Sequence, residues 1–156
     1  MVKLVKVKKE EVDILYRLLQ KYIYEMSGIY EEEMDETGDF SYPYLPYYFG
    51  YEGRCAYFIC AEDKRVGFLM INTHSWTGEK IDHSISEFTI FPRFRQKGYA
   101  LMAMEALTGE RKGSFQLKYS TKNKAGTKLW EQVERLYQAR KDILSDGEIC
   151  LTFFVL

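Results

Sequence analysis

A basic stretch in the middle of the chain combines residue types that bind phosphate. Arg93, Arg95 and Lys97 alternate along it, and Gly98 follows directly. Cationic side chains attract phosphate oxygens, and glycine lets the backbone approach a ligand closely or adopt a positive φ. If a helix begins at such a loop, its unpaired amides and its dipole favour an anion further. The stretch therefore predicts a phosphate-binding loop, with an ordinary basic surface turn as the alternative.

The flanking residues predict which elements hold this loop. Residues 81–91 are typical of a central strand, and Pro92 has no amide hydrogen with which to continue a ladder. After the loop, apolar residues recur at helical spacing from Gly98 to Gly109. We therefore expect a strand, the loop and a helix in direct succession.

The loop sequence excludes two common nucleotide-binding motifs, because neither G-x-G-x-x-G nor G-x-x-x-x-G-K-[ST] occurs in it. It reads Arg95-x-x-Gly98-x-Ala100, which resembles the acetyl-CoA loop of the GNAT superfamily of N-acetyltransferases, [QR]-x-x-G-x-[GA]. Downstream, residues 123–130 fit the family's N-x-x-[AG]-x-x-[LF]-[YW] signature and follow a strand-like run at 115–119. The two matches stand in the order that the family has.

This resemblance implies a fold, a reaction and a cosubstrate. The fold is α/β (α+β), a GNAT-like mixed, mostly antiparallel sheet of about six to seven strands flanked by helices. The reaction is direct transfer of the acetyl group of acetyl-CoA, the cosubstrate, to a small-molecule or peptide amine. The alternative is a non-catalytic acyl-CoA-binding or regulatory module.

The resemblance also implies cofactor-binding positions. The strand backbone would hold the pantetheine arm, the loop amides and one arginine would hold the diphosphate, and the second motif would lie near the pantetheine. These expected residues are Phe88, Thr89, Ile90, Arg95, Gln96, Lys97, Gly98, Tyr99, Ala100, Leu101, Asn123 and Trp130.

Two catalytic roles are expected. Glu87, at the head of the central strand, is the preferred general base, directly or through water, although a structural carboxylate is an equal alternative. Many family members have at Trp130 a tyrosine that protonates the departing thiolate, and an indole cannot do this. Tyr137, two helical turns further on, is the preferred substitute. Tyr119 and water are the other candidates.

The strongest shift in composition lies between the first helix and the second strand. Residues 31–39 carry six carboxylates, and an aromatic run follows at 42–49. Acidic and aromatic groups together would suit a cationic amine through charge attraction and cation–π contact. A solvated acidic loop followed by aromatic packing is the alternative.

Composition bounds the remaining functions. The chain has 156 residues, 46% of them hydrophobic, and a net charge of −1, so we expect one domain over 1–156 and no nucleic-acid or membrane partner. Three cysteines in no paired pattern, with His74 and His83 far from any other ligand, favour a reduced cytoplasmic protein without a metal site. A homodimer is left open.

The remaining elements follow from periodicity. We expect a first strand with a bulge at Leu4-Val5, an amphipathic helix from Val12 to a stop at Gly28, and a hairpin of 56–61 with 66–71. The apolar helix face is expected to pack on the sheet rather than on a partner. At the other end we expect a helix over 131–140 and a strand over 148–156, with only a weak strand pattern between them.

Overall fold

The computed structural model describes all 156 residues and contains one seven-stranded sheet in the order β1-β2-β3-β4-β5-β7-β6. Only β4 and β5 run parallel, so the expected mixed, mostly antiparallel sheet is confirmed. The strands are β1 (Val2–Lys6), β2 (Cys55–Ala61), β3 (Lys64–Asn72), β4 (His83–Ile90), β5 (Gly113–Tyr119), β6 (Arg140–Ile143) and β7 (Ile149–Val155). The helices are α1 (Val12–Tyr30), α2 (Tyr99–Glu110) and α3 (Lys124–Tyr137).

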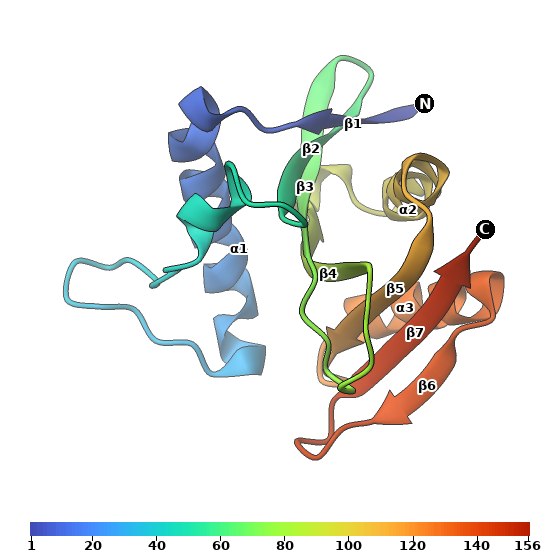
Figure 1. The fold of residues 1–156 in the computed structure, drawn as a ribbon. Coiled ribbons are helices and arrows are strands. Elements are labelled where there is room, and N and C mark those ends of the chain that lie inside the picture. Colours follow the sequence, from blue (N-terminus) through green and yellow to red (C-terminus); the bar gives the residue numbers. More distant parts are fainter.

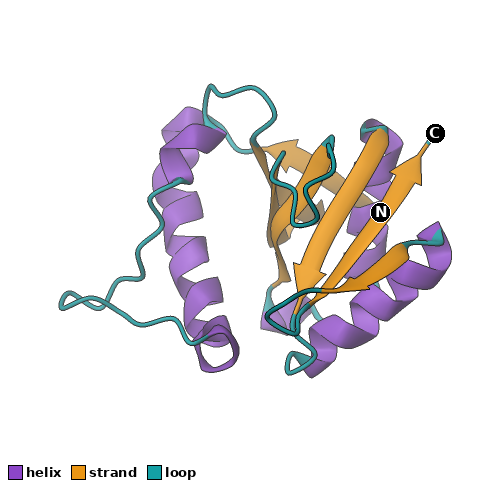
Figure 2. Ribbon diagram, turned by 60° about the horizontal axis from the view of Figure 1, so that its bottom comes forward, coloured by secondary structure: helices purple, strands orange, loops and turns teal.

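The helices cover both faces of the sheet. Helix α1 lies on one face, and α2 and α3 lie on the other (Figures 1 and 2). Both faces of the central strands are therefore apolar, as in β3, where Phe68 packs toward α1 and Leu69 toward α2. Leu15 and Leu19 of α1 are completely buried, which confirms the expected core face of this helix. None of the helices has the length and hydrophobicity needed to cross a membrane.

The N-terminal elements differ from expectation at two points. Strand β1 pairs with β2 in continuous register, so the bulge expected at Leu4-Val5 is wrong. The register shifts instead between β2 and β3, opposite Ile59 and Cys60, where Val66 of β3 is the additional residue. Helix α1 does not stop at Gly28 but runs to Tyr30, where Glu31 in the left-handed conformation ends it. A single glycine costs a helix only about 1 kcal/mol, which tertiary packing offsets.

The C-terminal elements resolve the weak pattern found there. Helix α3 ends at Tyr137, three residues earlier than expected, because Gln138 takes the left-handed conformation with φ 52°. The chain then forms the short edge strand β6, which pairs with β7. Strand β7 lies between β5 and β6 in the sheet and pairs along its whole length with β5.

The feature that positions the site is the divergence of β4 from β5. The two strands pair only over His83–Ile85 with Phe115–Leu117, and from Ser86 onward β4 has no partner on that side. On its other side β4 stays paired with β3 as far as Ile90. The sheet is thus open along one edge of β4, between α1 and α3.

Candidate active site

The open edge of β4 presents backbone groups in alternation. The Phe91 amide donates to the Val66 carbonyl of β3. Because backbone groups alternate in direction along a strand, the amides of Thr89 and Glu87 also point toward β3. The backbone groups of Phe88 and Ile90 therefore point toward the open edge. A ligand strand lying in the gap would therefore meet the backbone of Phe88 and Ile90. The Ile90 carbonyl already accepts the Arg95 guanidinium at 2.7 Å.

The loop after β4 exposes a row of free amides. A 3-10 turn over Pro92–Phe94 leads to Gln96 with φ 62° and Gly98 with φ 80°, two left-handed residues before α2 begins. The backbone amides of Gln96–Leu101 donate to no acceptor in the chain, and no side chain caps the helix. Such amides at a helix start form an anion site. The structure thus places the residues expected to hold a diphosphate at one helix terminus.

The guanidinium of Arg95, which the resemblance assigns to the diphosphate, is paired with helix α1 in this structure. It forms two hydrogen bonds of 2.7 Å to the carboxylate of Glu25 in α1, and this pair lowers the pKa of Glu25. Arg95 thus ties the loop to α1. Basic charge beside the loop comes from Lys64, Arg93 and Lys97, which line a hollow of about 200 Å³ there.

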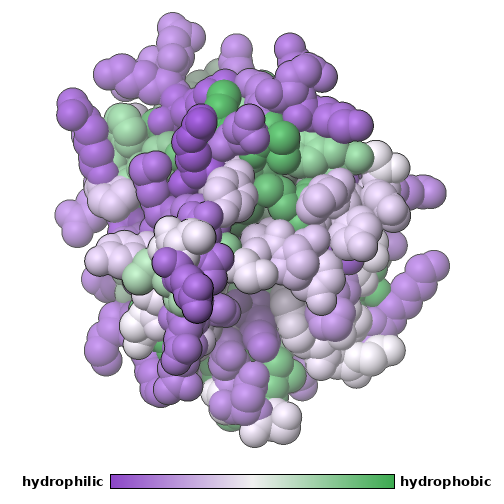
Figure 3. Space-filling model, turned by 90° about the vertical axis from the view of Figure 1, so that its left-hand side faces the viewer, coloured by the Kyte–Doolittle hydropathy of each residue, from purple (hydrophilic) through white to green (hydrophobic).

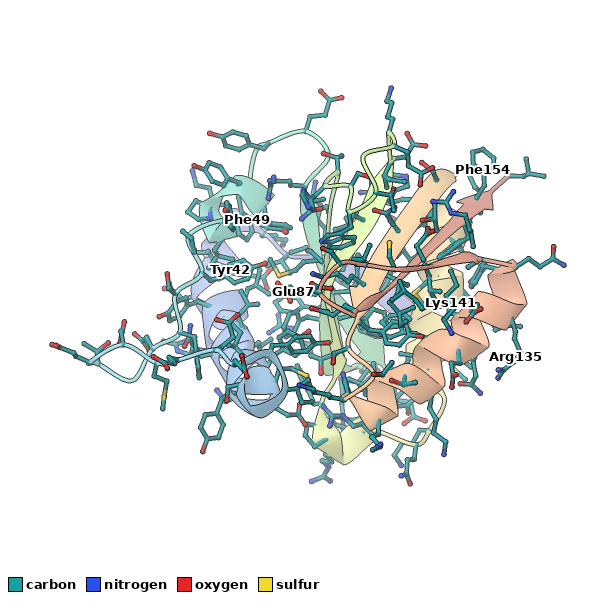
Figure 4. All side chains as sticks on the ribbon, turned by 90° about the horizontal axis from the view of Figure 1, so that it is seen from below. Tyr42, Phe49, Glu87, Arg135, Lys141 and Phe154 are labelled. Carbon is teal, nitrogen blue, oxygen red and sulfur yellow. The ribbon has the colours of Figure 1, made fainter.

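Glu87 lies where the strands part, and its side chain points toward α1. The hydroxyl of Tyr42 donates a 2.8 Å hydrogen bond to Glu87 Oε2, and Figure 4 shows the two side chains close together beside α1. Burial raises the pKa of Glu87 to about 7, the hydrogen bonds from Tyr42 and Tyr22 oppose this rise, and the charge of Glu32 adds to it. A carboxyl group of this pKa can both accept and release a proton near neutrality.

A cavity of about 400 Å³ opens in front of Glu87. Its walls are mostly aromatic and charged side chains from α1, the following loop, β4, β5 and the β6–β7 turn. The lining residues are Tyr22, Ile23, Met26, Tyr30, Glu32, Ser41, Tyr42, Trp76, Ile85, Ser86, Glu87, Lys118 and Glu148. The cavity therefore joins a titratable carboxyl group to a surface suited to an amine.

The residues of the second motif lie beside the open strand or cap a helix. Trp130 of α3 is 8% exposed and meets Phe88 edge to face at 5.3 Å between ring centroids. Asn123 caps α3, since its Oδ1 accepts the Gly126 amide at 3.0 Å. A side chain on Gly126 would collide with Asn123, so glycine in the motif permits this cap.

The side chain of Tyr137 is held away from the open edge of β4. Its hydroxyl shares a 3.1 Å hydrogen bond with Thr108 of α2, and its ring stacks on Phe153 of β7 at 4.8 Å. Trp130 lies seven residues earlier on α3, a separation of about 10 Å along the helix. These contacts give Tyr137 a packing role and argue against the acid role that the sequence predicted, which the turnover of Tyr137→Phe tests.

The acidic segment and the aromatic run each contribute one residue to the cavity wall. The sequence had indicated only that the two segments as a whole could suit a cationic amine. Of the segment 31–39, Glu32 lines the cavity, whereas Asp35 organises an exposed turn by accepting the amides of Thr37 and Asp39. Of the aromatic run, Tyr42 reaches Glu87, a contact that sequence analysis missed. Figure 3 shows that hydrophilic side chains cover most of this α1 side of the molecule.

Other lining residues were also missed. Tyr22 was assigned to the core face of α1, and Tyr30 was expected to follow the end of that helix at Gly28. Lys118 and Glu148 lie in or beside strands. Glu87 itself was expected at the site, but the direction of its side chain was not, and the available signal was the spacing of Ile85, Phe88 and Ile90, which breaks strict alternation within β4.

Comparison with known proteins gives this geometry its context. The sequence model of the Acetyltransferase (GNAT) family matches residues 20–132. No curated protein sequence matches the chain. Among solved structures, an acetyltransferase from Thermus thermophilus is similar with TM-score 0.65 and 15% identity over 97% of this chain and 96% of that one.

Two further solved structures are similar to the chain. An aminoglycoside acetyltransferase in complex with coenzyme A has TM-score 0.69 and 12% identity, covering 99% of this chain and 95% of that one. A ribosomal-protein alanine N-acetyltransferase from Escherichia coli has TM-score 0.64 and 14% identity, covering 99% and 94%. The family match spans most of the chain and includes β4, the loop and the start of α3. The chain therefore belongs to the acetyltransferase (GNAT) family, as its two motifs predicted.

Proposed function

We propose that this chain transfers the acetyl group of acetyl-CoA directly to the amine of a small, cationic acceptor bound in the cavity before Glu87. The observation that carries the proposal is the coincidence of three features at one place: the open edge of β4, the free amides of Gln96–Leu101, and Glu87 with its pKa near 7. The first two suit the pantetheine and diphosphate of CoA, and the third suits an amine that must lose a proton.

Glu87 is the proposed general base. An amine attacks the thioester carbonyl only when neutral, and it must lose a proton as the new C–N bond forms and the C–S bond breaks. With a pKa of about 7, Glu87 is largely ionised in mildly alkaline solution and accepts this proton directly or through water. Tyr42 holds the carboxylate in place through its 2.8 Å hydrogen bond.

The cosubstrate contacts are proposed from the positions of the matching residues. Phe88 and Ile90 would pair with the pantetheine arm at the open edge, and the row of loop amides would bind the diphosphate. Coenzyme A in the aminoglycoside acetyltransferase complex supports this choice of cosubstrate. Trp130 packs on Phe88 and shields the same edge from water.

The acceptor is proposed from the cavity wall. Tyr22, Tyr30, Tyr42 and Trp76 provide aromatic surface, and Glu32 and Glu148 provide negative charge. Similar structures include proteins named for aminoglycoside and ribosomal-protein acceptors, which are both amines. A peptide amine is the second acceptor class to test. The expected single domain and cytoplasmic location remain predictions.

The test is release of free thiol from acetyl-CoA with a panel of polyamines, aminoglycosides, amino acids and ribosomal peptides. Parent protein should turn over at least one amine, and Glu87→Gln should lose on the order of a hundredfold or more in rate while CoA still raises its melting temperature. Glu131→Gln, on the exposed face of α3, is the matched control.

One outcome would favour the alternative function. Undiminished stabilisation by CoA together with no turnover of any amine would indicate a non-catalytic acyl-CoA-binding module. The feature that favours this outcome is Trp130, which stands where many family members have a tyrosine that protonates the thiolate.

A further inference from the structure

We infer that the acceptor is an elongated aliphatic amine with a second cationic group, a linear diamine or polyamine, and that Glu148 binds this second group. The inference rests on the proposed function, because it takes the cavity before Glu87 as the place of the reacting amine. It adds a second subsite further along α1.

The cavity continues into a neighbouring hollow. This hollow, of about 400 Å³, lies between the end of α1, the loop after β5 and the β6–β7 turn. Tyr30 and Glu148 line both spaces, so the two meet at these side chains. The Tyr30 hydroxyl accepts the Ser120 amide at 3.1 Å, which fixes the ring in this shared wall.

The extension carries an excess of negative charge. Three carboxylates, those of Glu31, Asp146 and Glu148, line it together with one lysine, Lys122. A second lysine, Lys118, lies 3.4 Å from Asp146 and 3.6 Å from Glu148, so the carboxylates still outnumber the ammonium groups by one. The ammonium group of Lys118 thus forms two long ion pairs, one with each of these two carboxylates. The local field favours a further cation.

Glu148 has capacity to bind one more donor. Its Oε2 is the oxygen that faces Lys118, whereas Oε1 is screened from solvent and accepts no hydrogen bond from the protein. A shielded carboxylate oxygen without a donor is rare in folded proteins. An ammonium group of a ligand in the cleft would supply the missing donor, and its charge would balance the excess carboxylate.

The length of the cleft favours a linear ligand. Tyr22 contacts Glu87 and Tyr30 lies beside Glu148, and these tyrosines are eight residues apart on α1, about 12 Å along the helix axis. A reacting amine at Glu87 and a second ammonium group at Glu148 must therefore be joined by an extended chain. Aromatic rings along this path would cover its methylene groups.

The decisive measurement is binding of three amines to the CoA-loaded protein by isothermal titration calorimetry. 1,8-Diaminooctane and octylamine have the same carbon chain but differ in the second amine, and putrescine has both amines on a chain too short to span about 12 Å. 1,8-Diaminooctane should bind on the order of tenfold or more tightly than octylamine or putrescine, the effect expected of one charge-assisted contact. Glu148→Gln should remove this preference, and Glu148→Asp should keep part of it.

Controls separate the second subsite from general effects. Glu131→Gln removes one exposed carboxylate of α3 and should leave the preference unchanged. Equal affinity of parent protein for all three amines would overturn the inference, as would an undiminished preference in Glu148→Gln with an unaltered melting temperature. Thiol release is measured in parallel, so loss of transfer with all amines would count against the proposed function, while the binding data would still decide the second subsite.

Discussion

Tyr42 controls the protonation of Glu87 through one hydrogen bond, and its removal should move the pH dependence of catalysis. The Tyr42 hydroxyl donates to Glu87 Oε2 at 2.8 Å. Burial and the nearby charge of Glu87 raise the pKa of Tyr42, so this hydroxyl remains a donor throughout the working pH range. Tyr42→Phe keeps the ring and removes only the donor.

The direction and size of the shift follow from the energetics of that bond. The bond stabilises the charged form of Glu87, so its loss must raise the Glu87 pKa above about 7. A hydrogen bond to a charged group contributes about 1.5–3 kcal/mol, and one pKa unit corresponds to about 1.4 kcal/mol. We expect the rising limb of kcat/KM against pH to move up by about one to two units.

The assay is thiol release over a pH series with one acceptor throughout, so that the acceptor's own titration is common to all variants. Tyr44→Phe is the matched control, because Tyr44 lies in the same aromatic run, is 58% exposed and has no hydroxyl hydrogen bond to Glu87. Glu87→Gln should abolish the part of the limb that belongs to the enzyme and leave only the titration of the acceptor. An unmoved limb in Tyr42→Phe, with the fold intact, would refute the assignment of Glu87 as the titrating base.

Three further changes test the loop and the acid. Gly98→Glu should fold but lose CoA affinity by on the order of a hundredfold, because its carboxylate would repel the diphosphate at the free amides. Gly38→Glu is the control, since Gly38 has a similar positive φ and open space around it, and it should keep the affinity. Calorimetry measures both, and equal losses would indicate backbone strain alone. Glu25→Gln frees the loop's guanidinium and should tighten CoA binding about threefold to tenfold, while weaker binding would show that the pair holds the loop in shape. Tyr137→Phe should keep full turnover and Trp130→Tyr should gain rate, both measured with saturating acetyl-CoA. A loss of roughly a hundredfold in Tyr137→Phe would instead show that Tyr137 protonates the departing thiolate.

The parts of the site that sequence could predict are local in the chain. The strand, the loop and α2 follow one another within the 28 residues from His83 to Glu110, and proline, glycine and helical spacing each act on their own neighbours. The contacts that sequence could not predict join distant segments. Tyr42 meets Glu87 across 45 positions, and Arg95 meets Glu25 across 70. Neither contact can be predicted from the periodicity of the sequence, because both depend on where α1 and the following loop cross the sheet.

A single extra residue in β4 decides which way Glu87 points. Across β3, Ile85 is opposite Ile71 and Phe88 is opposite Leu69, and all four pack under α2 and α3. Residues 85 and 88 can share a face only because the register shifts between Met70 and Ile71, which leaves Ser86 as the additional residue.

Without that shift, Glu87 would share the face of Ile85 and point into the apolar core, where an unpaired carboxylate is costly. With it, Glu87 lies opposite Met70 and faces α1 and Tyr42. Ser86 is itself held by hydrogen bonds to the Met70 carbonyl at 3.1 Å and to the Tyr48 hydroxyl at 2.9 Å. The loop between α1 and β2 thus acts twice on the site: Tyr48 fixes the bulge that turns Glu87 toward the cavity, and Tyr42 then sets the charge state of its carboxyl group.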